Sequence, residues 1–226
     1  FISKVTGVPM VRLGVNAMLG KSLNEQGFQG GLWKKQKIVA VKAPVFSMSK
    51  LAGVDTYLGP EMKSTGEVMG IDYELRPAIA KALMAAGLML PPQGSILLSI
   101  ADRNKAEAQS MIEGLARAGY RLYATGGTAA MIKGLGLQVS EVPKRLSEGH
   151  PNVLDLIVDG TVDAVVNTVT GEREILQDGF EIRRAAVEMR IPCFTSLDTA
   201  RAAVESLSGG ADSYNVKPLD AYLNGR

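Results

Sequence analysis

The second half of the sequence alternates between short apolar runs and longer segments of helical periodicity, and this alternation limits the folds open to the chain. From Ser95 onward, apolar runs are separated by stretches in which apolar residues return every three or four positions. Such a pattern with short joints predicts a parallel sheet covered by helices on both faces. The predicted class is therefore α/β with a Rossmann-like parallel sheet. The strands we expect are residues 95–100, 121–124, 138–142, 164–167 and 192–195.

Helices are expected between and after these strands. They cover residues 105–118, 127–135, 152–158, 178–189 and 197–207. In open parallel sheets, ligands bind beyond the carboxyl ends of the strands. This rule directs attention to residues 100–105, 125–128, 142–144, 167–171 and 195–197.

A break in the pattern precedes this region. Pro91 and Pro92, between Gly87 and Gly94, cannot continue a helix and indicate a linker. We therefore expect one domain over residues 1–88 and a second over residues 93–226. The first has helical spacing at 8–19 and 75–84 and strand-like residues at 37–46 and 66–71. These few elements would make a poor independent domain. We therefore interpret this part as a partial α+β segment that completes a larger sheet.

Composition narrows the class of protein. The 25 basic residues nearly balance the 23 acidic ones, which argues against nucleic-acid binding. No apolar run approaches the roughly 20 residues that a membrane helix needs, and the start does not resemble a signal peptide. A single cysteine, Cys193, cannot form an intrachain disulfide, which fits a cytoplasmic setting. Because the chain starts with Phe1 and not Met, we expect it to be part of a longer one.

The sharpest local signal is the run Thr125, Gly126, Gly127 and Thr128, which follows a strand and opens a helix. Glycines let the backbone approach an anion, hydroxyls donate to phosphate oxygens, and the free amides of a helix start point the same way. The alternative is a tight turn in which Thr125 or Thr128 only caps the helix.

Lys105 strengthens the phosphate interpretation. It follows the first strand of this region at a helix start, where Asn104 and Glu107 resemble a capping box. A lysine there opposes the helix dipole by roughly 0.3 to 1 kcal/mol. An anion shared with the Thr125 turn would explain it, and a solvated surface lysine is the alternative.

Polar residues also follow two further strands. Lys144 follows the third, and Asn167, Thr168 and Thr170 follow the fourth. Together they can read a sugar phosphate and a base edge, but no general base poised near neutral pH stands among them. We expect binding and no catalytic residue.

Four other residues invite a chemical role but have plainer explanations. The lone histidine, His150, cannot build a metal site without partners and is expected in a loop or cap, so no metal site is predicted. Arg183 and Arg184 are expected on a solvated face or a domain contact. Cys193 is expected to be a small core residue.

Long motifs carry a family resemblance over essentially the whole chain. The run LGPEMKSTGEVMG, with FISKVTGVP and VDTYLGPE, is similar to the closing part of an ATP-grasp half of carbamoyl-phosphate synthase large subunits. The motifs LLSIADRNK, ATGGTA, EGHPNVLDLI, VVNTVTG and IRRAAVEMRIPCFTSLDTA resemble the methylglyoxal-synthase-like regulatory domain that ends the same subunit.

The resemblance implies an allosteric role. Effector nucleotides such as UMP or IMP would place their phosphate on Lys105, Thr125 and Thr128, while Lys144 and Asn167 would contact the rest of the nucleotide. Val169 replaces a hydroxyl-bearing residue of some members.

The resemblance also implies a working parent. The parent would make carbamoyl phosphate from bicarbonate, ammonia from glutamine, and ATP with Mg²⁺ or Mn²⁺, for pyrimidine and arginine synthesis. Its partners would be a glutaminase small subunit and the rest of the large subunit.

A second effector position follows from the same likeness. Leu58, Thr195 and the adjacent Ser196 match an interdomain region that lies by ornithine in some members. The ornithine-binding glutamate of those members falls at Ala43, which cannot hold an ammonium group, so ornithine activation is not expected. The family's metal-binding glutamate and asparagine would precede Phe1. We therefore expect no cofactor and no activity in this segment alone.

Other functions stay open. Methylglyoxal synthase shares the domain, but its catalytic aspartate aligns with His150. A cyclohydrolase domain of purine synthesis has a similar glycine turn, and the ATP-grasp motif argues against both. A stand-alone binding module for a phosphate ligand differs only in lacking a parent polypeptide.

Overall fold

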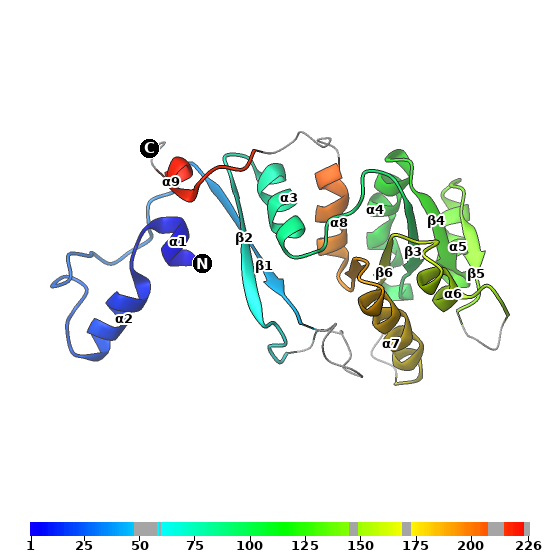
Figure 1. The fold of residues 1–226 in the computed structure, drawn as a ribbon, viewed down its shortest axis with the longest axis horizontal. Helices are drawn as coiled ribbons and strands as arrows, with labels where there is room; N and C mark the ends of the chain where they lie inside the picture. The colour runs from blue at the N-terminus through cyan, green and yellow to red at the C-terminus, as the bar shows by residue number, and fades with distance from the viewer. Residues whose placement is uncertain (48–57, 59, 145–148, 169–172, 208–214, 224–226) are drawn as a thin grey trace.

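The computed structural model describes residues 1–47, 58, 60–144, 149–168, 173–207 and 215–223. Figure 1 shows two units, one around a two-stranded sheet and one around a five-stranded sheet. The segment after Ala85 leads from the first unit into the second.

The second unit has the strand order β5-β4-β3-β6-β7, and every neighbouring pair is parallel. This confirms the predicted α/β class. The strands are β3 (Ser95–Ser99), β4 (Arg121–Thr125), β5 (Ser140–Val142), β6 (Ala164–Asn167) and β7 (Cys193–Phe194). The helices are α4 (Lys105–Arg117), α5 (Gly126–Gly134), α6 (Val153–Val158), α7 (Arg173–Glu188) and α8 (Leu197–Leu207), with a short 3₁₀ turn, η2 (Asp102–Asn104).

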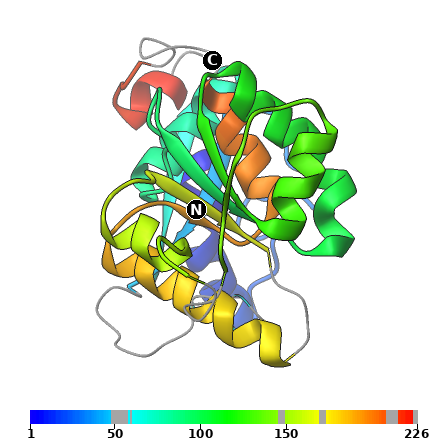
Figure 2. The ribbon, with the colours of Figure 1, turned by 90° about the vertical axis from the view of Figure 1, so that its right-hand side faces the viewer.

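Alternation along the strands divides the core between the two faces of this sheet. Ile96 and Leu98 of β3 pack with α4, α5 and α8, while Leu97 packs with α6 and α7. In β6, Val166 and Val165 divide in the same way. Figure 2 shows α8 and α4 on one side of the sheet and α7 on the other.

The first unit is a hairpin-like pair with one helix against it. Strand β1 (Val39–Val45) pairs antiparallel with β2 (Gly66–Asp72), and α3 (Leu75–Ala85) packs on them. Ahead of them, α1 (Ile2–Thr6) and α2 (Met10–Met18) leave most of their apolar side chains exposed.

The end of the described chain returns to the first unit. Helix α9 (Leu219–Leu223) lies beside β2, where the rings of Tyr222 and Tyr73 are 5.5 Å apart (Figure 1). The Tyr222 hydroxyl also bonds Lys81 of α3 at 2.7 Å. Helices α3 and α8 pack together as well, which brings the two units into contact.

Some local expectations were wrong. The helix expected at 8–19 is present as α2, but α1 ahead of it was not predicted, and α7 begins at Arg173 instead of residue 178. Asn104 makes no side-chain cap of α4, because the 3₁₀ turn already gives it helical backbone angles. A capping box occurs instead at Asn152 and Asp155, before α6. No helix in the described ranges is long and apolar enough to cross a membrane.

Candidate functional site

The strand register brings three predicted segments into one row at the carboxyl edge of the sheet. Ser99 pairs with Asn167 across β3 and β6, and Thr125 is one residue beyond the Leu98–Ala124 pair, so it lies in the same row on β4. Strands lie 4.7–4.9 Å apart, so the Cα atoms of Thr125 and Asn167 are about 10 Å apart. A single small ligand can reach both.

The glycine turn forms the start of α5. Thr125 is the residue before the helix, in an extended conformation, and its side chain makes no cap hydrogen bond. Gly126 and Gly127 supply the first two amides, which have no partner within the helix. Thr128 is buried, and its Oγ1 accepts a hydrogen bond from the Ile100 amide at 3.0 Å. The Thr128 hydroxyl therefore holds the end of β3, and the Thr125 hydroxyl has no partner among the described residues.

Lys105 lies over this turn. Its Nζ is 2.9 Å from the point where a Cβ would stand on Gly127. As predicted, Lys105 is the first residue of α4. Its ammonium group pairs with Asp102 Oδ1 at 2.6 Å and thereby lowers the pKa of that exposed carboxyl group. A cation at the positive end of α5 is unfavourable unless negative charge lies nearby.

Glu141 supplies negative charge on the far side of the turn. Its Oε1 is 3.3 Å from the Cβ position of Gly126, and its Oε2 pairs with Lys133 at 2.8 Å. Sequence reasoning missed this carboxylate. Its place on β5, next to β4, is the signal that would have found it.

The end of β3 is held from both neighbouring strands. Thr128, beyond β4, accepts from Ile100, and Thr168, beyond β6, accepts from the Ala101 amide at 2.8 Å. The chain order changes direction between β3 and β6, which is where open parallel sheets bind ligands. The two hydroxyls thus fix the loop that leads to Lys105.

Asn167 contacts a buried arginine. Arg183 is fully buried, and its Nη1 donates to Asn167 Oδ1 at 2.8 Å. The expectation that Arg183 lies on a solvated face was wrong. It shares a helical stripe with Gly179, Ile182 and Ala186, and that spacing is the signal that sequence reasoning overlooked. Arg184, by contrast, pairs with Glu188 at 2.6 Å.

Lys144 lies at the same side of the sheet. Its Nζ is 3.8 Å from Asp178 Oδ2, and Asp178 directly precedes the Gly179 that faces Asn167. This ion pair is partly exposed, so its net contribution to stability is small, about 0–1 kcal/mol. Through Asp178, Lys144 therefore borders the Asn167 region.

His150 belongs to the cap of α6. Its Nδ1 lies 2.6 Å from Asp155 Oδ2, and the same oxygen accepts from the Asn152 amide at 2.8 Å. The hydrogen bond from the Asn152 backbone and the contact with His150 lower the pKa of Asp155. This agrees with the loop or capping role expected for His150.

The remaining predicted positions are less connected. Thr170 lies outside the described residues, Leu58 is exposed, and Cys193 is partly buried at the start of β7. Within the described ranges, no hydrogen bond or ion pair joins Leu58 to Thr195 or Ser196. Ala43, where the ornithine ligand was sought, is buried on β1.

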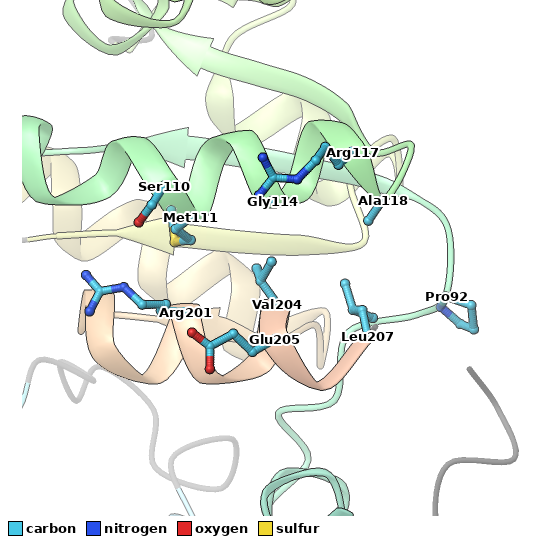
Figure 3. Close-up of a pocket in the computed structure, with 10 residues that line it drawn as sticks. All are labelled: Pro92, Ser110, Met111, Gly114, Arg117, Ala118, Arg201, Val204, Glu205 and Leu207. Atoms are coloured by element: carbon cyan, nitrogen blue, oxygen red, sulfur yellow. The ribbon is translucent and has the colours of Figure 1, made fainter. Parts of the chain in front are cut away.

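A separate cavity of about 480 Å³ lies between α4 and α8 (Figure 3). Its base is apolar, with Met111 and Val204, and Arg201 and Glu205 stand along α8. None of the predicted site residues lines it. In the part of the chain that the structure describes, no three His, Cys, Asp or Glu side chains gather as a metal site.

Comparisons with known proteins agree with the motifs. Residues 107–195 match the MGS-like domain family. The carbamoyl phosphate synthase large chain of Thermomicrobium roseum is 53% identical over 222 residues, which cover 98% of this chain and 21% of that protein. That of Thermoanaerobacter sp. strain X514 is 47% identical over 207 residues, which cover 92% of this chain and 19% of that protein.

A solved methylglyoxal synthase from Elizabethkingia anophelis is 20% identical, with a TM-score of 0.40, and covers 59% of this chain and 92% of that one. This chain spans about a fifth of the length of the curated relatives it matches. The chain is a homologue of a C-terminal part of the carbamoyl phosphate synthase large chain, and it contains an MGS-like domain.

Proposed function

We propose that this chain is the regulatory end of a carbamoyl phosphate synthase large chain and that it binds a nucleotide monophosphate such as UMP or IMP. The phosphate would lie at the start of α5, against the amides of Gly126 and Gly127, the Thr125 hydroxyl and the Lys105 ammonium group. The binding site would extend along the strand ends to Asn167, with Lys144 at its border.

The observation that carries this proposal is the position of Lys105. The Lys105 ammonium group and the positive amino end of α5 lie close together, with Nζ 2.9 Å from the Cβ position of Gly127, and the exposed Asp102 carboxylate pairs with the lysine. A bound phosphate would become the common partner of the ammonium group and the helix end. The free Thr125 hydroxyl adds a donor in the same place.

For the parent protein, the name shared by its relatives supports the rest of the proposal. It would make carbamoyl phosphate from bicarbonate, ammonia from glutamine, and ATP with Mg²⁺ or Mn²⁺, in the cytoplasm, for pyrimidine and arginine synthesis. A glutaminase small subunit and the rest of the large chain would be its partners, and residues 1–88 would complete an ATP-grasp domain.

Calorimetric titration with UMP and IMP tests the binding site. Lys105→Ala should weaken binding by about 1.5 to 3 kcal/mol, the scale of a charge-assisted hydrogen bond, with little change in melting temperature. Arg121→Ala is the matched control, because it also removes one positive charge, from an exposed residue at the opposite end of β4. Equal affinities in the wild type and the Lys105 variant would refute the proposed site.

A further inference from the structure

The amide group of Asn167 is held from behind by a buried cation. Arg183 Nη1 lies 2.8 Å from Asn167 Oδ1, and both side chains are almost completely buried. Gly179, one turn before Arg183 on α7, makes room for this contact. A Cβ on Gly179 would lie 2.7 Å from Arg183 Nη1 and 3.3 Å from Asn167 Oδ1.

Hydrogen-bond chemistry fixes the direction of this amide. A guanidinium group only donates, so the atom of Asn167 that faces Arg183 must be the carbonyl oxygen. The amide nitrogen is then turned away from Arg183. Among the described residues, nothing accepts a hydrogen bond from the Asn167 Nδ2, and these residues do not enclose it completely.

The free nitrogen lies on the side of the sheet where a ligand at the Thr125 turn would extend. Asn167 and Thr125 occupy the same row of the sheet, two strands apart. Asn167 is two residues after Val165 on β6, so both side chains are on the same face of the sheet, and Val165 packs there with α6 and α7. Tyr123 of β4 packs with the same cluster, and Thr125, two residues later, is therefore on that face of the sheet too.

We propose that Arg183 is a positioning residue that keeps the Asn167 NH₂ group turned toward the ligand, so that the site selects a ligand with a hydrogen-bond acceptor about 10 Å from the Thr125 turn. The acceptor is a carbonyl or hydroxyl oxygen on the part of the ligand beyond its phosphate. Inorganic phosphate does not reach it. This inference rests on the proposed function, because it assumes that the phosphate lies at Lys105.

Asn167→Asp separates this role from a structural one. A carboxylate still accepts from Arg183, so the fold and melting temperature should be kept, but the donor toward the ligand is lost. Affinity for UMP or IMP should fall roughly tenfold or more, since an acceptor then faces an acceptor. Affinity for inorganic phosphate, measured by competition, should change by less than about threefold, because the added charge is paired and about one Debye length away.

The ratio of the two affinities decides the result. If Asn167 serves only as the acceptor of Arg183, aspartate replaces it and both affinities stay as in the wild type. If aspartate acts only by charge repulsion, both affinities fall by the same factor. Either result overturns the inference.

A double-mutant cycle tests the part played by Arg183. Glutamine can face Asn167 with either end of its amide, so Arg183→Gln should weaken nucleotide binding while Asn167 is present. Combined with Asn167→Ala, it should cost nothing further, because no amide is left for Arg183 to orient. Additive losses would overturn the positioning role. If Arg183→Gln does not fold, Arg183→Met, which has no hydrogen-bond donor and so leaves the Asn167 amide free to turn, takes its place.

The controls also distinguish this inference from the proposed function. If the wild-type chain binds neither UMP, IMP nor inorganic phosphate, the proposed function fails and this inference with it. If the wild type binds and Lys105→Ala weakens binding, but Asn167→Asp does not change the affinity ratio, only this inference fails.

Discussion

Tyr120 shows how burial of one group becomes a measurable pH effect. Its side chain is 6% exposed, and its hydroxyl donates to the Pro91 carbonyl oxygen. Burial, together with the nearby charge of Asp163, raises the pKa of Tyr120 to about 12. Because the folded pKa lies above the unfolded value near 10, the stabilisation is complete below pH 10 and is lost as pH rises toward 12.

The measurement is a difference titration of tyrosinate absorbance between the wild type and Tyr120→Phe. We expect the absorbance of this one tyrosine to appear near pH 12. The wild type should also lose stability relative to the variant between pH 10 and 12. Ionisation of this tyrosine at its usual value of about 10 would show that the buried contact with Pro91 does not persist in solution.

Sequence reasoning could single out residues that lie near the end of a strand. It missed residues whose position depends on contacts formed only in the folded protein. Lys105 lies shortly beyond the end of β3 and Thr125 at the end of β4, so the rule for strand ends directed attention to both. Arg183 lies on a helix, where a charged residue is ordinarily exposed. Its burial depends on Asn167 and on the space beside Gly179, which are brought together only by the tertiary fold.

Among the elements, α3 and β2 have an unusually close approach that one glycine permits. A Cβ on Gly70 would lie 2.0 Å from the Ala78 carbonyl oxygen and 2.5 Å from the Ala82 amide nitrogen. Gly70→Ala should therefore push the helix away and lower the free energy of unfolding by about 1 to 3 kcal/mol or more. Urea denaturation followed by circular dichroism measures the loss.

Gly66→Ala is the matched control on the same strand, because nothing lies within 4 Å of its Cβ position. It should leave stability unchanged or slightly higher, since alanine loses less backbone entropy than glycine on folding. Equal effects of the two substitutions would mean that backbone entropy and not packing controls both positions.

The elements themselves were largely predictable because their periodicity is strong. Strand β6 and helix α8 begin and end where the sequence placed them. The boundary of α7 was missed by five residues, although Ile175 and Leu176 already have helical spacing to Ile182 and Phe180 and were overlooked. The capping box was assigned to Asn104 because sequence spacing does not reveal the 3₁₀ turn before α4.

Across the whole molecule, the return of α9 to the first unit was not predicted. A helix of five residues carries too little periodicity to be recognised in sequence. Its position depends on groups far along the chain, since Lys81 bonds the Tyr222 hydroxyl at 2.7 Å and Asp72 at 2.7 Å. Burial alone would lower the pKa of Lys81, but the hydrogen bonds to Asp72 and Tyr222 outweigh burial and raise it.

From the contacts of α9, we predict that Tyr222 holds the end of the described chain against the first unit. The ring is 6% exposed, lies 5.5 Å from Tyr73, and has Lys81 4.9 Å from its centre. Tyr222→Ala removes all of these contacts and should lower stability by about 2 to 4 kcal/mol. Tyr222→Phe keeps the ring but loses the bonds to Lys81 and to the Asn215 carbonyl oxygen, so it should cost only about 1 kcal/mol.

Hydrogen exchange followed by mass spectrometry locates the effect of these changes. In Tyr222→Ala, residues 215–223 and the adjoining end of β2 should lose protection, while the five-stranded sheet should keep it, because that sheet has its own two hydrophobic clusters. Val216→Ala is the control on the same segment, since Val216 is 84% exposed, and it should change neither protection nor stability. Unchanged protection of residues 215–223 in Tyr222→Ala would show that α9 is held by contacts other than this ring.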